Sequence, residues 1–167
     1  MSEKYVIPSK TRIGHVHLKV ADLSRALRFY CDLLGFELIT TYGSDAAFIS
    51  AGGYHHHIGL NTWYSKNAPP APIQSVGLFH MAILYPTRKD LATAYLRLLS
   101  ADYPLTGVAD HGVSEALYLN DPDNNGVELY WDKPRDQWPV KPDGSIDMYT
   151  KYLDLDDLIE EIKGTGL

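Results

Sequence analysis

Short runs of alternating apolar and polar residues recur along most of the chain, and such runs are typical of half-buried strands. Two longer segments instead repeat apolar residues at helical spacing. The pattern predicts the order strand, helix and three strands, and it predicts this order twice. The expected strands are 13–20, 36–41, 46–50 and 57–62, then 77–85, 106–109, 115–120 and 126–131, with helices at 22–34 and 88–100.

The repeat places a histidine at the same position of each opening strand, His15 in the first copy and His80 in the second. Two equivalent strands can point these imidazoles at one shared cavity. We therefore expect an α+β fold in which two βαβββ modules, about 13–63 and 77–132, form a curved, partly open mixed β-barrel with the helices outside. The extension 133–167 contains an acidic amphipathic helix near 153–162, which we assign to packing or an interface. All of residues 1–167 are expected to form one domain.

Composition excludes several classes of partner. The chain has 167 residues, 45% of them hydrophobic, which is enough for one domain with a core. Its formal charge of -6 argues against nucleic acid, because such binding depends on clustered Lys and Arg. The first twelve residues lack a long apolar run, so we expect neither a signal peptide nor a membrane span. The single cysteine, Cys31, has no internal partner and suits a buried thiol in the cytoplasm.

The first module carries the residues of a known family. Its pattern resembles the vicinal oxygen chelate superfamily in a series that comprises His15, Leu18, Val20, Asp22, Ala26, Phe29, Tyr30, Leu34, Gly35 and Phe36. That superfamily includes glyoxalases, fosfomycin-modifying thiol transferases, bleomycin-binding proteins and extradiol dioxygenases. The resemblance implies the fold and leaves the reaction open, since one fold hosts several chemistries.

The resemblance implies a metal held by the first and last strands of each module. The four candidate positions are His15, a residue near Gly59, His80 and Glu128. Glycine cannot ligate, so two histidines and one carboxylate remain. This set suits non-haem Fe(II), or Mn(II) with the same geometry, and it leaves adjacent positions open for substrate and oxygen. Glu128 also lies in an otherwise apolar strand, where a carboxylate is rare unless it is paired or metal-bound.

Two further segments resemble those of extradiol dioxygenases, particularly the catechol 2,3-dioxygenase-like members. The run 111–128 looks like their signature, which implies that His111 and Tyr118 hydrogen-bond the substrate oxygens. The run 54–59 is similar to the segment that carries an acid-base histidine. The family pattern fits His56 best, whereas strand alternation alone favours His57, so this choice stays open. His55 is expected to be a surface residue.

The resemblance thus implies an extradiol-type dioxygenase that cleaves a catecholic ring with O2, with His56, His111 and Tyr118 as catalytic residues. Homodimers are usual among the proteins that the chain resembles. Three alternatives remain. The chain could be a glyoxalase-like or fosfomycin-type lyase or transferase, a binding module without turnover, or half of a longer dioxygenase.

Overall fold

The computed structural model describes residues 4–163, and its elements follow the predicted order twice. The first module contains β1 (Val16–Lys19), α1 (Leu23–Leu27), a π-helical segment η1 (Arg28–Leu33), β2 (Glu37–Tyr42), β3 (Ala46–Ser50) and β4 (Ile58–Asn61). The second contains β5 (Met81–Leu84), α2 (Arg88–Ser100), β6 (Gly107–Asp110), β7 (Ser114–Asn120) and β8 (Gly126–Asp132). A 3-10 turn η2 (Arg135–Gln137) and helix α3 (Leu155–Lys163) follow. The α+β class and the duplicated module are confirmed.

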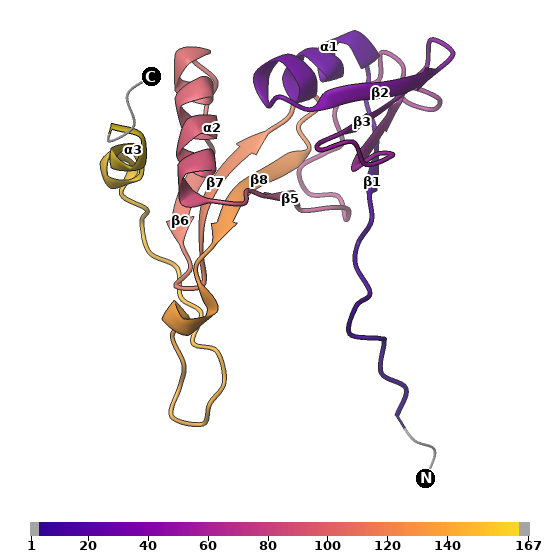
Figure 1. Ribbon diagram of the computed structural model, residues 1–167. Helices are drawn as coiled ribbons and strands as arrows, with labels where there is room; N and C mark the ends of the chain where they lie inside the picture. The colour runs from indigo at the N-terminus through magenta and orange to yellow at the C-terminus, as the bar shows by residue number, and fades with distance from the viewer. Residues whose placement is uncertain (1–3, 164–167) are drawn as a thin grey trace.

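Each module forms its own four-stranded mixed sheet. The strand orders are β1-β4-β3-β2 and β5-β8-β7-β6. Each sheet has one parallel pair at the same edge, formed by β1 and β4 in the first sheet and by β5 and β8 in the second. The registers also correspond, because His17 lies opposite Gly59 in the first sheet and Ala82 lies opposite Glu128 in the second. The sheets are curved but do not close into a barrel (Figure 1).

The helices begin at capping residues that the sequence supplies. Asp22 accepts a hydrogen bond of 2.9 Å from the backbone N–H of Arg25, and Thr87 caps α2 in the same way. The expectation of one continuous helix over 22–34 is wrong in detail, because the chain changes to π-helical geometry after Leu27. The Leu34 N–H bonds to the carbonyl of Phe29, five residues earlier, and this wider turn leads into β2.

The modules contact each other on the side of their helices. One hydrophobic cluster contains buried residues of both modules. The Tyr30 hydroxyl donates a buried hydrogen bond of 2.9 Å to Asp121, and burial together with this carboxylate raises the pKa of Tyr30. Arg25 pairs with Asp123 nearby, and Arg97 of α2 donates to the carbonyl of Leu33 at 2.8 Å. That residues 1–167 form a single domain stays a prediction.

The extension contains the helix Leu155–Lys163, which packs against the second module. In Figure 1, α3 lies beside α2. Leu158 is fully buried there, and Arg88 at the start of α2 pairs with Asp157 and Glu161 of α3. Cys31 is half-buried rather than buried, and partial burial raises the pKa of its thiol. None of the helices within 4–163 has the length and apolar character needed to cross a membrane.

Candidate active site

His80 and Glu128 form a close pair at the parallel β5–β8 edge. Nε2 of His80 lies 3.0 Å from Oε2 of Glu128, and the Glu128 side chain is only 12% exposed. Gly126 permits this approach, because a Cβ at that position would overlap the carbonyl oxygen of Phe79 and lie 3.0 Å from the Cβ of His80. The expected burial of Glu128 is observed, and its partner is one of the two repeated histidines.

Tyr118 and His111 extend this pair into a hydrogen-bonded series. Tyr118 lies directly opposite Glu128 across β7 and β8, and its hydroxyl donates to Oε1 of Glu128 at 3.1 Å. On its other side the hydroxyl lies 2.8 Å from Nε2 of His111. Burial, together with the charge of Glu128, raises the pKa of Tyr118 to about 12. The phenol therefore keeps its proton at neutral pH and remains a donor.

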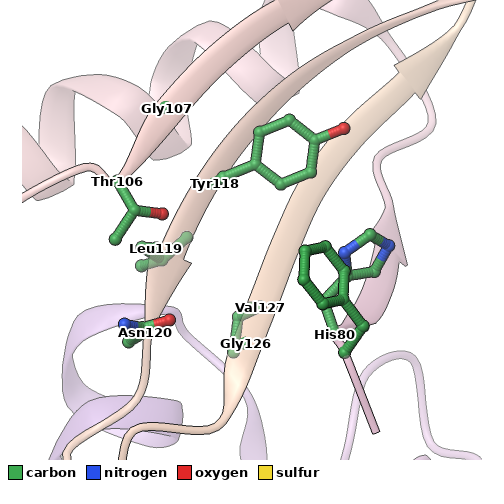
Figure 2. A pocket seen from close by; sticks show the side chains of 9 residues that line it. His80, Thr106, Gly107, Tyr118, Leu119, Asn120, Gly126 and Val127 are labelled. Atoms are coloured by element: carbon green, nitrogen blue, oxygen red, sulfur yellow. The ribbon is translucent and has the colours of Figure 1, made fainter. Parts of the chain in front are cut away.

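A cavity of about 350 Å³ opens beside this series. Figure 2 shows His80 and Tyr118 on either side of β8, both facing the cavity. Its other lining residues are mostly small or apolar, namely Phe79, Thr106, Gly107, Leu119, Asn120, Gly126 and Val127. A space of this size is in the range of small-molecule sites, and its volume is sufficient for one substituted aromatic ring.

The remaining candidate histidines gather on the first module. The ring centroids of His15 and His56 are 4.3 Å apart. His57 instead points to the end of β3, where its Nδ1 lies 2.9 Å from the hydroxyl of Ser50. The structure therefore places His56, and not His57, beside His15. Partial burial and the neighbouring imidazole of His15 lower the pKa of His56. His55 contacts His56, with 2.8 Å between their Nδ1 atoms.

Gly59 occupies the position that corresponds to Glu128, and its space is already filled. His17 lies opposite Gly59, and a Cβ there would come within 2.9 Å of the imidazole ring of His17. The ring of His17 also contacts Phe48 and Trp63. The first module thus has no room for a carboxylate at this position, which agrees with a ligand set of at most three residues.

The two histidine groups are separate in this structure. Among residues 4–163 no three or more His, Cys, Asp or Glu side chains are arranged to hold a metal ion. His80 and Glu128 still suit adjacent positions on one ion, because two bonds of about 2.1 Å at a right angle place their donor atoms about 3.0 Å apart. Their chemistry, one imidazole and one carboxylate, also fits a divalent metal. His15 does not join this pair here, and the three-ligand set stays a prediction.

A family comparison identifies the fold. The model of the "Glyoxalase/Bleomycin resistance protein/Dioxygenase superfamily" matches residues 12–129. The chain belongs to this superfamily. The match covers both modules, from just before His15 through Glu128, and it ends before the C-terminal extension.

Curated members of the superfamily include dioxygenases. The chain is 39% identical over 156 residues to the catechol-2,3-dioxygenase of Bacillus subtilis, covering 93% of this chain and 53% of that protein. It is 33% identical over 122 residues to biphenyl-2,3-diol 1,2-dioxygenase 3 of Rhodococcus globerulus, covering 72% and 63%. The chain therefore spans between half and two thirds of the length of these relatives.

Solved structures agree on the superfamily fold. The lactoylglutathione lyase of Agrobacterium tumefaciens superposes with a TM-score of 0.59 at 24% identity, over 75% of this chain and 95% of that one. At this identity the likeness concerns the fold alone.

Two features of the site differ from the sequence expectations. His15 and His80 lie one residue before β1 and β5 rather than within them, because the strand pairing of β1 starts at Val16, whose N–H bonds to the carbonyl of His57. Tyr149 and Thr150 of the extension also contact His111, and no pattern in the sequence predicts these two contacts. These residues lie outside the regular elements, so no periodicity in the sequence indicates them.

Proposed function

We propose that this protein is a metal-dependent extradiol-type dioxygenase that cleaves a catecholic ring with O2. The observation that supports this most directly is the series His111, Tyr118, Glu128 and His80, whose members follow one another at hydrogen-bond distance beside a cavity of suitable size. The series connects His111 and Tyr118, the proposed acid-base groups, to Glu128 and His80, the proposed metal ligands. The curated relatives with dioxygenase names support the same class.

The metal would be held by His80 and Glu128, with His15 as the third ligand. Fe(II) fits such a set, and Mn(II) fits the same geometry. When bound, the metal supplies a template that brings the diol and O2 together and carries electron density from the ring to oxygen. An open face on the ion is a requirement of this chemistry, and Gly59 leaves the first module without a fourth ligand.

Protein side chains near the pair would manage protons and position the substrate. A catechol must lose protons before it can chelate a metal, and His111 can accept a proton. His111 is connected to the proposed ligand Glu128 by hydrogen bonds through Tyr118. Tyr118 keeps its proton at neutral pH and can donate a hydrogen bond to a substrate oxygen. His56, which lies beside His15, would be the acid-base group on the side of the first module. The expected homodimer and cytoplasmic location stay predictions.

The direct test is ring cleavage by the reconstituted protein. The full chain is loaded with Fe(II) without oxygen, mixed with catechol and exposed to air, while oxygen uptake and the yellow ring-opened product are followed. We expect both signals in the wild type and neither in Glu128→Gln, which keeps the shape but loses the charged ligand. Glu37→Gln on the exposed strand β2 is the matched control and should remain active.

Two results would count against the proposal. One is a loaded wild type that consumes no catechol or related diol. The other is isomerisation of methylglyoxal hemithioacetal without any ring cleavage, which would assign the site to glyoxalase chemistry while leaving the superfamily unchanged.

A further inference from the structure

One row of residues crosses the second sheet from the proposed metal pair to the edge strand β6. Glu128 of β8 lies opposite Tyr118 of β7, and Tyr118 lies opposite Gly107 of β6. Residues directly opposite each other in paired strands stand on the same face of a sheet. Because neighbouring strands are roughly 4.8 Å apart, Gly107 lies about 10 Å from Glu128, at the far end of the row.

Gly107 is a glycine at a position where the backbone does not require one. It lies within a strand, and its φ is outside the left-handed region. A Cβ there would have Cδ2 of Tyr118 as its nearest neighbour, at 3.8 Å, which is ordinary van der Waals contact. A side chain could therefore occupy this position, and glycine within a strand is intrinsically unfavourable. Its missing side chain leaves space beside the Tyr118 ring, and this space forms part of the cavity.

This space lies where a substituent of a bound diol would point. Figure 2 shows Thr106 and Gly107 on one side of Tyr118 and His80 on the other. A diol whose two oxygens are held near His80 would direct the opposite edge of its ring, which contains position 4, along the row toward Gly107. Unsubstituted catechol has only hydrogen at that edge. The space at Gly107 therefore suits an additional group on the ring.

The lining of the cavity favours a group without charge. None of the described residues that line it is Lys, Arg, Asp or Glu. The amide nitrogen of Asn120, one of the polar atoms nearby, already donates to Asn124 at 2.9 Å. A carboxylate at this end would lose its water without gaining a cation, and that is costly. An alkyl group would instead be buried against the ring of Tyr118, which is favourable.

We propose that Gly107 is a specificity-determining position, whose missing side chain admits an uncharged alkyl substituent at position 4 of the diol ring. The identity of the ligand as a diol rests on the proposed dioxygenase function. The space itself does not, because it is a property of β6 and β7. The preferred substrates would then be 4-alkylcatechols, ahead of catechol and of diols that carry a ring carboxylate.

Substrate competition tests the size of the space. The Fe(II)-loaded full chain is assayed with catechol, 4-methylcatechol and 4-tert-butylcatechol, and we expect kcat/KM to rise with the alkyl group. Gly107→Val fills the space and should lower kcat/KM for 4-tert-butylcatechol, relative to catechol, by roughly 10-fold to 200-fold, as for a change of one methylene in an apolar pocket. Gly107→Ala should have a smaller effect in the same direction. Gly77→Val makes the same change at an exposed position with no atom within 4 Å and should keep the wild-type ratio.

A charged substrate tests the lining. 3,4-Dihydroxybenzoate carries a carboxylate at the same ring position, and the wild type should use it much less well than 4-methylcatechol. Thr106→Lys places an ammonium group beside Gly107 and should raise kcat/KM for 3,4-dihydroxybenzoate relative to 4-methylcatechol. Thr41→Lys on the exposed strand β2 adds the same charge elsewhere and should leave this ratio unchanged. Circular dichroism and melting temperature establish that each variant is folded.

Binding can be measured without turnover. The full chain is loaded with Zn(II), which is diamagnetic and not redox-active, and mixed with 4-tert-butylcatechol in the absence of oxygen. We expect nuclear Overhauser contacts between the tert-butyl protons and the Hα protons of Gly107, whose signals are identified by their loss in Gly107→Ala. Folded Gly107→Val should bind this ligand more weakly.

The outcomes separate the two proposals. Cleavage of diols with equal effects of Gly107→Val on catechol and 4-tert-butylcatechol would overturn the role of Gly107 and leave the dioxygenase function intact. A wild type that prefers 3,4-dihydroxybenzoate, or a bound tert-butyl group without contact to Gly107, would overturn it as well. If the wild type cleaves no diol, the function proposed above fails, and the contacts seen by NMR alone decide whether Gly107 receives the substituent.

Discussion

The hydroxyl of Tyr118 donates a hydrogen bond of 3.1 Å to Oε1 of Glu128, its direct neighbour across β7 and β8. Because the pKa of this phenol is raised to about 12, a difference spectrum between wild type and Tyr118→Phe should show one phenol that ionises near pH 12 rather than near 10. The variant should also lower kcat by roughly 100-fold, the lower end of the range for a lost hydrogen-bond donor to a reacting oxygen. Tyr42→Phe on exposed β2 is the control and should keep full activity. Ionisation of Tyr118 near its ordinary value would contradict the observed geometry.

Metal retention should separate ligands from acid-base groups. His80→Ala removes one member of the donor pair and should abolish retention of the metal, as measured by emission spectroscopy after gel filtration. His56→Ala should retain the metal and slow turnover by roughly 100-fold to 10,000-fold. Glu37→Gln on the exposed strand β2 is the control and should change neither. Loss of metal from His56→Ala would instead make that residue a ligand.

Gly126 allows Phe79 and His80, which precede β5, to lie close to β8. Replacing Gly126 should therefore displace His80 more than Glu128. Gly126→Ala places a methyl group against the Phe79 carbonyl and should cost about 1–3 kcal/mol of unfolding free energy, typical of overpacking. We expect weaker metal binding, measured by titration, in a chain that still folds. Gly107→Ala lines the same cavity but meets its nearest atom at 3.8 Å, and should bind metal normally. Equal effects of the two substitutions would rule out this explanation.

Asp110, which precedes His111, should make the free energy of unfolding fall at acidic pH. Burial by itself favours its neutral form, but hydrogen bonds from the Lys133 ammonium and the Gly112 N–H outweigh burial and lower the pKa of Asp110. A carboxyl with a lowered pKa stabilises the fold above its unfolded value, here 3.8, and this contribution is lost as the pH falls through the folded value.

Asp110→Asn should therefore cost about 1.5–3 kcal/mol at neutral pH, as expected for hydrogen bonds to a charged group. Its melting temperature should also change less with pH below 4 than that of the wild type. Asp136→Asn, at an exposed position of η2, is the control. Identical acid dependence of wild type and Asp110→Asn would show that other carboxyls dominate.

The sequence predicted the fold well because strands and helices differ in hydrophobic periodicity, and the same order of these periodicities occurs in both βαβββ modules. The equivalence of Gly59 and Glu128 followed from the same repetition, and the strand registers confirm it. The strand ends were less accurate. Alternation favoured His57 over His56 because it assumed an extended chain, whereas β4 begins at Ile58 and the residues before it form turns.

The parts of the site that could not be predicted depend on contacts distant in sequence. His111 meets Tyr149 and Thr150 through an isolated bridge in a segment without regular structure, so neither propensity nor periodicity carries a signal for it. The wide π turn after Leu27 is likewise set by how the chain enters β2. The separation of His15 from the His80 pair depends on how two curved sheets are placed, and local sequence does not encode that directly.

The matching registers of the two sheets also bear on how such a chain can diverge. His17 fills the place beside Gly59, while its counterpart Ala82 leaves Glu128 free to meet His80. The first copy therefore packs this position with an imidazole beside a glycine, and the second copy combines a small residue with a carboxylate. Because the two sheets have equivalent registers but separate side chains, a substitution at one copy of the position leaves the other copy unchanged.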